Sequence, residues 1–336
     1  MNQYIMSVLV VFGIGAFVSN STQAVQAQAH ASSEAPEVAL ARAAAEGEFW
    51  FKRMQLALNE LNYRASFIAM QPSGLQAYRW VHSVTNMGNN IEVIEGLNGP
   101  HNQAIRFNNR VTYLSSVNDA YSVPATTLSG PIPSGLYGKY ANIHKSYNVV
   151  AVGGDRVVDR DAQHVRLIPH TRDRYLYSLW IDRDTGMLLG INTYLPSGDI
   201  VEQILLTSLD VQDEPLVELV QLEEQWETSP ETQTPAMLMS ESKWQFDWLP
   251  PGFELERQQR VRVAMNGPMA EHFMFSDGMA KFSIYINEDS SQMAPVQYEN
   301  LISMVSVLHN SFAVTVVGKI PLPVAQQVAG SVRFAP

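Results

Sequence analysis

Four short segments of alternating apolar and polar residues follow one another between Val157 and Val211 and predict four β-strands. Two of their connections, Asp182–Gly186 and Pro196–Asp199, are short and rich in Gly and Asp. Loops this short join antiparallel neighbours, because a parallel connection needs a long crossover. The pattern therefore predicts an antiparallel meander.

A helix and five further strands are predicted upstream. Apolar residues recur every three or four positions at Trp50, Met54, Leu58 and Leu61, which is typical of a helix with one apolar face. The predicted strands are Tyr63–Met70, Leu75–Val84, Asn90–Leu97, Ala104–Phe107 and Val111–Leu114. A twisted sheet of about nine strands tends to curl. With the helix in its concave side, it would form an open half-barrel.

Residues 122–147 interrupt this pattern with several Pro and Gly residues, so we expect a long surface excursion there. Three tyrosines in it, Tyr137, Tyr140 and Tyr147, are candidates for covering an opening in the sheet.

A second, smaller domain is predicted from Lys243 onward. Its elements are an aromatic-polar alternation over Trp244–Phe253, a hairpin of Glu271–Phe275 and Met279–Ile286, a strand at Ala313–Gly318, and a terminal helix through Val324, Val328 and Val332. The fold class is therefore α+β, with an N-terminal open antiparallel half-barrel holding a helical plug and a smaller C-terminal α+β domain.

The chain divides into four predicted segments. Residues 1–29 resemble a signal peptide, with an apolar stretch and small residues that allow cleavage after Ala24, Ala27 or Ala29; an uncleaved anchor is the alternative. The half-barrel domain covers 36–212, an acidic linker with a short helix over Pro215–Leu222 covers 213–242, and the C-terminal domain covers 243–336. We expect a periplasmic protein.

Charge and cysteine content restrict the classes of function that the chain can have. The net charge is −11, and every charged residue from Asp184 to Ser242 is acidic. This stretch is either a docking face for a basic partner or a linker kept extended by repulsion. Nucleic-acid binding, which needs a basic surface, is disfavoured. With no cysteine, the chain has no disulfide, thiolate nucleophile or Cys-ligated metal, and export without disulfides suits a bacterial periplasm.

The sequence contains no motif for catalysis or for a metal. The eight histidines lack ligand spacing, and Asp182–Gly186 resembles the start of a calcium loop but lacks its terminal Glu. A hydrolase would need an acid/base constellation that we do not find. We therefore expect a binding protein without metal or cofactor.

Aromatic and basic residues provide the remaining candidates. Phe67, Trp80, Tyr177 and Trp180 either fill the core or line a hydrophobic cavity on the concave side. A neighbouring segment contributes five arginines that could surround the cavity mouth: Arg156, Arg160, Arg166, Arg172 and Arg174. That combination would suit an anionic amphiphile such as a phosphorylated glycolipid.

Six short stretches resemble the RseB/MucB family, periplasmic regulators of the sigma-E (AlgU-type) envelope-stress response. They are Leu61–Ile68, Asn98–Pro100, Tyr177–Asp182, Trp248–Phe253, Ser276–Gly278 and Val316–Pro321, and they extend over nearly all of the chain that follows the signal segment.

The resemblance implies an N-terminal domain similar to the lipoprotein carriers LolA and LolB. It also implies that both domains bind the periplasmic part of the anti-sigma factor RseA/MucA and protect it from regulated proteolysis. Lipopolysaccharide or lipid would then weaken this binding. Self-association is implied as well. Candidates for the partner surface are Trp244, Trp248, Phe282 and Tyr285, each with core packing as its alternative. A lipid or lipoprotein carrier without a regulatory partner remains the second hypothesis.

Overall fold

The computed structural model describes residues 36–117, 119–226, 237–238, 242–262, 269–288, 295–309 and 311–335. The predicted signal peptide with Ala24, Ala27 and Ala29 lies outside these ranges. Within them, no helix is both long enough and apolar enough to pass through a membrane.

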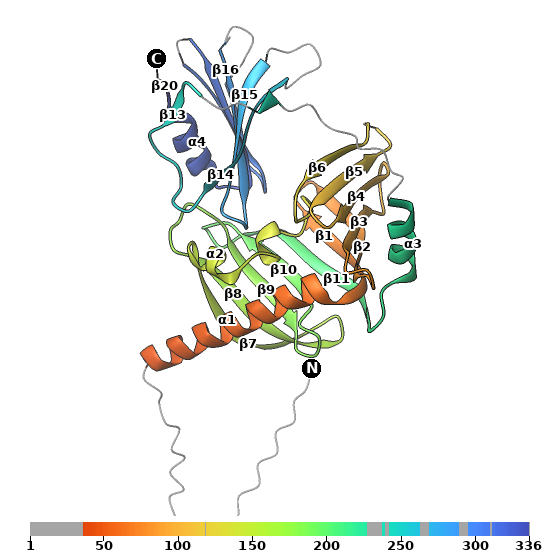
Figure 1. Cartoon of the computed structure of the whole chain (residues 1–336). Coiled ribbons are helices and arrows are strands. Elements are labelled where there is room, and N and C mark those ends of the chain that lie inside the picture. The colour runs from red at the N-terminus through yellow and green to blue at the C-terminus, as the bar shows by residue number, and fades with distance from the viewer. Residues whose placement is uncertain are drawn as a thin grey trace, which may run out of the picture.

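The N-terminal part is built on one antiparallel sheet of eleven strands in the order β6-β5-β4-β3-β2-β1-β11-β10-β9-β8-β7. These strands are β1 (Asn62–Gln71), β2 (Gly74–Val84), β3 (Asn90–Gly96), β4 (Asn102–Phe107), β5 (Arg110–Ser115), β6 (Tyr121–Pro124), β7 (Tyr147–Val157), β8 (Arg160–Pro169), β9 (Leu176–Asp182), β10 (Leu188–Tyr194) and β11 (Ile200–Gln212). Because β6 and β7 are the two edges, the sheet is an open half-barrel (Figure 1).

The predicted strands and the meander β8–β11 are confirmed, but the sheet has two more strands than the sequence pattern indicated. The strand β6 is short and ends at Pro124. The strand β7 contains Gly153 and Gly154, and its pairing with β8 shifts register between Ala151 and Gly153. Glycines and the bulge remove the regular alternation that identifies a strand.

The helix α1 (Pro36–Glu60) lies across the inner side of the sheet, against β7 and β8 (Figure 1). Its buried side chains include Phe51, Met54 and Leu58, whereas Trp50 is half-buried and Leu61 follows the helix end. All four residues of the predicted stripe lie in or against the core, and Phe51 adds to it. Close approach to β7 requires Gly47, because a Cβ there would lie 2.5 Å from the carbonyl oxygen of Val149.

The 122–147 segment is not the surface excursion that its Pro and Gly content suggested. It contains η1 (Ser134–Leu136) and α2 (Tyr140–His144), and it buries Leu128, Ile132 and Leu136 in the same core as α1. Tyr137 and Tyr147 are buried as well, and Tyr140 is half-buried. Proline and glycine prevented a long regular element here without preventing burial.

The helix α3 (Val217–Trp226) covers the outer face of β2–β4, where Leu216, Leu219 and Trp226 pack against Val81 and Ile105. It confirms the short helix predicted within the acidic segment. Since α3 packs onto the first sheet, this part of the predicted linker belongs to the N-terminal core.

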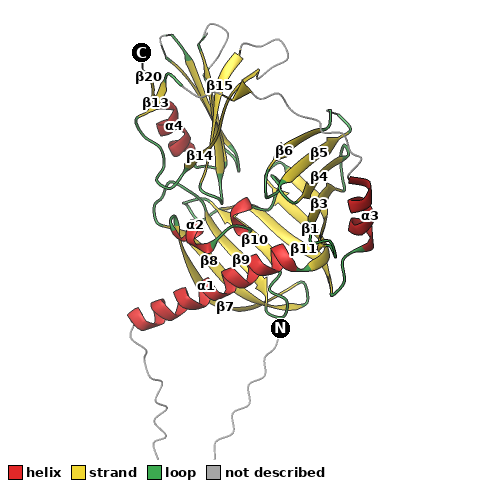
Figure 2. Cartoon of the chain, viewed as in Figure 1, coloured by secondary structure: helices red, strands yellow, loops and turns green. Residues whose placement is uncertain are grey.

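The C-terminal part holds a seven-stranded sheet in the order β12-β14-β15-β16-β19-β18-β17, with α4 (Leu322–Gly330) on one face (Figure 2). The strands are β12 (Met237–Leu238), β14 (Glu254–Arg262), β15 (Met269–Ser276), β16 (Lys281–Asn287), β17 (Val296–Tyr298), β18 (Ser303–Leu308) and β19 (Ala313–Gly318). A two-stranded sheet of β13 (Trp244–Phe246) and β20 (Val332–Phe334) completes it. The predicted hairpin is confirmed, whereas Val332 lies in β20 and not in the helix.

The N-terminal core gives a direct stability test. Trp80 is fully buried and its Nε1 donates to Glu92 at 2.8 Å. We expect Trp80→Ala to lower the free energy of unfolding by about 3–5 kcal/mol, because it leaves a cavity and removes a donor from a buried carboxylate. Urea denaturation checks this, with Leu75→Ala as the control on the same strand. Leu75 is 53% exposed, so an equal loss in both variants would contradict the described core.

Candidate binding site

The four aromatic candidates for a ligand cavity do not share one. Phe67, Trp80 and Tyr177 are at most 2% exposed and belong to the packed core. Trp180 lies on the outer face of β9, half-buried, where its ring stacks on His164 and its Nε1 donates to Asp155 at 2.9 Å. The structure thus favours core packing for the first three, because α1 and the 122–147 segment fill the concave side.

A buried carboxylate, Glu92, organises that filled interior. It accepts hydrogen bonds from Trp80 Nε1 at 2.8 Å, Tyr137 OH at 2.7 Å and Arg106 Nε at 2.9 Å. Burial, followed by the negative charge of Glu92, raises the pKa of Tyr137 well above its ordinary value, so the phenol stays a donor. This network attaches the 122–147 segment to the sheet. Sequence spacing gave no signal for it, because its members come from β2, β3, β4 and the 122–147 segment.

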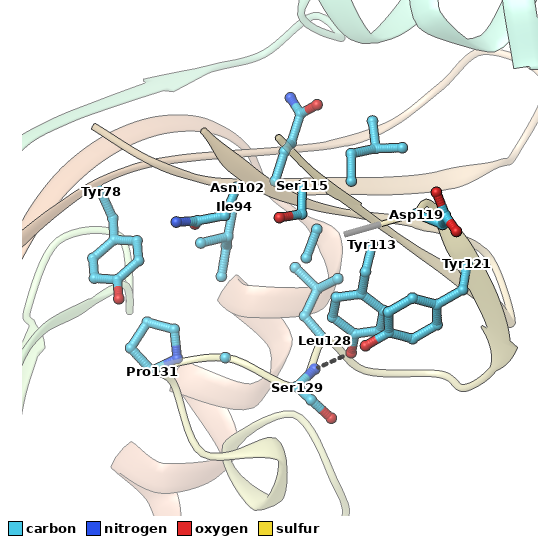
Figure 3. A pocket seen from close by; sticks show the side chains of 14 residues that line it. Tyr78, Ile94, Asn102, Tyr113, Ser115, Asp119, Tyr121, Leu128, Ser129 and Pro131 are labelled. Atoms are coloured by element: carbon cyan, nitrogen blue, oxygen red, sulfur yellow. Dashed lines mark hydrogen bonds between the residues drawn. The ribbon is translucent and has the colours of Figure 1, made fainter. Parts of the chain in front are cut away.

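A surface pocket of about 280 Å³ opens where the outer strands meet the 122–147 segment (Figure 3). Tyr113 and Tyr121 stack at its rim with ring centroids 5.0 Å apart, and the Tyr113 hydroxyl accepts from the backbone N–H of Ser129 at 3.1 Å. Tyr78 and Asn102 line the opposite side. Aromatic and amide groups of this kind suit contacts with a polypeptide. Sequence analysis did not identify this pocket.

The C-terminal sheet has one face without a helix among the described elements. This face carries His272, Ser283 and Tyr285, and Tyr285 stacks on His272 with centroids 4.6 Å apart. Burial, followed by the charge of Tyr113, raises the pKa of Tyr121 on β6, and the positive charge of Arg257 on β14 opposes that shift.

Only part of the predicted partner surface lies on accessible positions. Trp244 and Phe282 are 6% and 1% exposed and pack inside the C-terminal core. Phe282 and Tyr285 therefore occupy opposite faces of β16, as the alternation of a strand requires. Trp248 and Tyr285 are half-buried and retain exposed surface.

The five candidate arginines also differ in burial and in their ion-pair partners. Arg156 is exposed and pairs with Asp159, and Arg160 binds Asp182 through two hydrogen bonds of 3.0 and 2.9 Å. Arg174 is 1% exposed and lies inside the domain junction. Arg166 and Arg172 are exposed and have no carboxylate partner among the described residues. The five arginines therefore differ in burial and pairing, and a role for them at a cavity mouth stays a prediction.

The domain junction is centred on a buried ion pair. Arg174 Nη1 donates to Asp277 Oδ2 at 2.8 Å, and the Tyr147 hydroxyl donates to the same oxygen at 3.0 Å. Backbone N–H groups of Met279 and Ala280 donate to the other carboxylate oxygen. Burial raises the pKa of Asp277 even though these donors oppose the shift. A carboxylate so fully bonded fixes the β15–β16 turn against the N-terminal domain.

The described residues contain no cluster of three or more His, Asp or Glu side chains that could hold a metal ion. Both domains of the chain match known protein families. Residues 46–238 match the MucB/RseB N-terminal domain, and residues 239–333 match the MucB/RseB C-terminal domain. The chain belongs to the MucB/RseB family.

Relatives of this family match over most of their length. The sigma-E factor regulatory protein RseB of Salmonella typhimurium is 24% identical over 288 residues, covering 84% of this chain and 89% of the relative. The sigma factor AlgU regulatory protein MucB of Pseudomonas aeruginosa is 26% identical over 307 residues, covering 86% and 92%. A crystal structure of MucB in complex with MucA(peri) is 24% identical, with a TM-score of 0.69 over 86% of this chain and 99% of that chain. The shared fold includes both domains.

The structure of the junction predicts that its buried ion pair contributes much more to the free energy of unfolding than its exposed ion pair. We expect Asp277→Ala to lower the free energy of unfolding by about 3–5 kcal/mol, because it leaves the Arg174 guanidinium buried without its partner. Glu254→Ala removes the exposed junction pair with Lys145 and should cost less than about 1 kcal/mol. Denaturant titration of both variants makes the comparison, and similar losses would argue against a buried junction.

His272 predicts a pH dependence. Burial lowers its pKa to about 4, so between pH 4 and its ordinary value near 6.5 the unfolded chain binds more protons there than the folded chain. The free energy of unfolding should therefore fall as the pH drops through this window, by less than about 1.4 kcal/mol per pH unit since the ring is partly screened by solvent. His272→Gln should flatten that slope. An unchanged slope in His272→Gln would refute the assignment.

Proposed function

We propose that this protein is a periplasmic, non-catalytic negative regulator of sigma-E-type signalling. It binds the periplasmic segment of a membrane-bound anti-sigma factor of the MucA/RseA kind and protects that segment from regulated proteolysis. The observation that supports this most is the match of both domains to MucB/RseB, together with the shared fold of MucB in complex with MucA(peri).

The pocket on the N-terminal sheet and the helix-free face of the C-terminal sheet support a polypeptide partner. A stable protein interface buries about 800 Å² on each partner, which exceeds what a pocket of about 280 Å³ can offer alone. The helix-free face around Tyr285 and Met274 offers a second surface. A segment bound to these surfaces would be inaccessible to a protease, because the protease needs the same extended backbone.

Release of the partner by lipopolysaccharide or another acyl-chain lipid is part of this proposal. A ligand can shift the complex only by the difference between its affinities for the free and the bound regulator. Self-association of the regulator completes the proposal, and it needs neither a metal nor a cofactor.

Partner capture tests the proposal. The protein without its signal segment should retain the periplasmic segment of the host's MucA/RseA-type anti-sigma factor at micromolar or tighter affinity. We expect Tyr285→Ala to weaken binding at least tenfold, because aromatic residues at the centre of an interface dominate its energy. Tyr298→Ala, at a position 54% exposed on the edge strand β17, is the control. Failure of the wild-type protein to retain the segment would reject the proposal.

A carrier of lipid or lipoprotein remains the second candidate, because the half-barrel with its helical plug is the architecture expected for LolA/LolB-type carriers. The packed interior counts against it, since Phe67, Trp80 and Tyr177 are filled core positions and do not line the pocket of about 280 Å³. A carrier would ignore the anti-sigma segment and would retain lipid after gentle purification. Native mass spectrometry of the same preparation separates the two candidates.

A further inference from the structure

The pocket of about 280 Å³ on the N-terminal sheet owes its space to two small residues. Ala104 on β4 pairs with Ile94 on one side and with Tyr113 on the other, so a small side chain separates two large ones. Gly130 leaves free space beside Ile94, because the nearest atom to a Cβ there would be Ile94 Cδ1 at 3.9 Å. Sites for whole small molecules usually measure about 300–1,000 Å³. This pocket therefore suits a single long side chain.

The lining of this pocket has a buried apolar part and an accessible aromatic part (Figure 3). Ile94 and Leu128 are buried members of the N-terminal core and form its floor. Tyr121 is 40% exposed and stacks on Tyr113, whose hydroxyl is held by the backbone N–H of Ser129. Because one ring of the pair is anchored to the 122–147 segment, the aromatic wall is preorganised for a ligand.

The charge of the lining is negative and uncompensated. Asp119 is exposed and is the one charged residue among the described residues that line the pocket. It forms no ion pair or hydrogen bond with another residue in the described ranges. The positive charge of Arg257 acts on Tyr121, but Arg257 does not line the pocket. A free carboxylate beside an aromatic pair favours a cation.

We propose that this pocket binds the side chain of a lysine or arginine from a polypeptide. Its aliphatic stem lies on the apolar floor, and its charged end lies between Asp119 and the ring of Tyr121. Long basic side chains bury their stems on apolar surface while the charged group stays at the solvent boundary. The charged group is attracted both to a carboxylate and to the face of an aromatic ring.

Two other occupants fit the lining less well. A side chain with a carboxylate would be repelled by Asp119, and an aliphatic side chain would fill the floor without using the carboxylate. That the basic side chain belongs to the anti-sigma segment rests on the proposed function, whereas the preference of the pocket for a cation does not.

Short peptides test the pocket without the anti-sigma segment. The probes are acetyl-Gly-Arg-Gly-amide and two matched peptides that replace arginine by citrulline, which has nearly the same shape and no charge, or by norleucine. The protein without its signal segment, labelled with ¹³C in its tyrosine rings, reports binding through the signals of Tyr113 and Tyr121. These signals are assigned with Tyr113→Phe and Tyr121→Phe. We expect the arginine peptide to bind about three- to tenfold more tightly than either matched peptide.

Three variants locate the preference. Asp119→Asn should bring the ratio of arginine to citrulline affinity to about one, and Asp213→Asn, an equal change of charge at an exposed position outside the pocket, should leave it unchanged. Ala104→Leu fills the space and should weaken the arginine peptide at least tenfold. If this third variant does not fold, Asp119→Asn still decides, because an exposed side chain can be changed without disturbing the core.

Four results would overturn the cation pocket. They are equal affinity for the arginine and citrulline peptides in the wild type, a preference for arginine that survives in Asp119→Asn, arginine binding that persists unchanged in a folded Ala104→Leu, and no response of the Tyr113 and Tyr121 signals to any peptide.

A double-mutant cycle tests which polypeptide supplies the cation. Each lysine and arginine of the periplasmic anti-sigma segment is changed to glutamine and measured against wild type and Asp119→Asn. One of these changes should weaken binding several-fold in the wild type and have little effect in Asp119→Asn, because the two residues interact. If the segment binds but no basic residue couples to Asp119, this assignment of the occupant is overturned while the proposed function stands. If the wild type does not bind the segment, the proposed function fails, and the peptide results still decide the cation pocket.

Discussion

The buried ion pair between Arg174 and Asp277 determines how the two domains of this protein are joined. Both side chains are almost fully buried, and removing two charges from water is costly unless each is completely bonded. Asp277 meets that condition with Arg174, Tyr147 and two backbone N–H groups. The backbone contributes as well, since the N–H of Gly135 donates to the carbonyl of Gly278 at 2.6 Å. These bonds attach the β15–β16 turn of the C-terminal sheet to the N-terminal domain.

Each sheet of the molecule has surface that a helix covers and surface that no described helix covers. The covered surfaces stabilise the fold, and the uncovered surfaces are available for binding. The helices α1, α3 and α4 each bury an apolar surface, against the inside of the half-barrel, the outside of β2–β4 and one face of the C-terminal sheet. The described elements leave two sheet surfaces without a helix, namely the outer face of β7–β11 and the face of the C-terminal sheet that carries Tyr285. A regulator needs accessible surfaces of this kind, because it acts by occupying a partner and not by changing a bond.

Arginine side chains in the β7–β9 region have different roles because their electrostatic surroundings differ. Arg160 and Arg174 are neutralised by carboxylates and stabilise a turn and a junction, respectively. Arg166 and Arg172 are exposed and have no carboxylate partner among the described residues. The functional difference follows from partners and burial, not from residue type.

Local patterns in the sequence determined nine of the eleven strands of the first sheet and the antiparallel order of the meander. Alternation and short turns specified β8–β11, and the six family stretches indicated the regulator class before any contact was known. Only the tertiary structure determined which residues distant in sequence contact one another. Arg174 and Asp277 are 103 positions apart, and no spacing rule connects them. The same reason explains why Trp80 and Phe282 became core and why the 122–147 segment is buried, since burial depends on what the rest of the chain places above a residue.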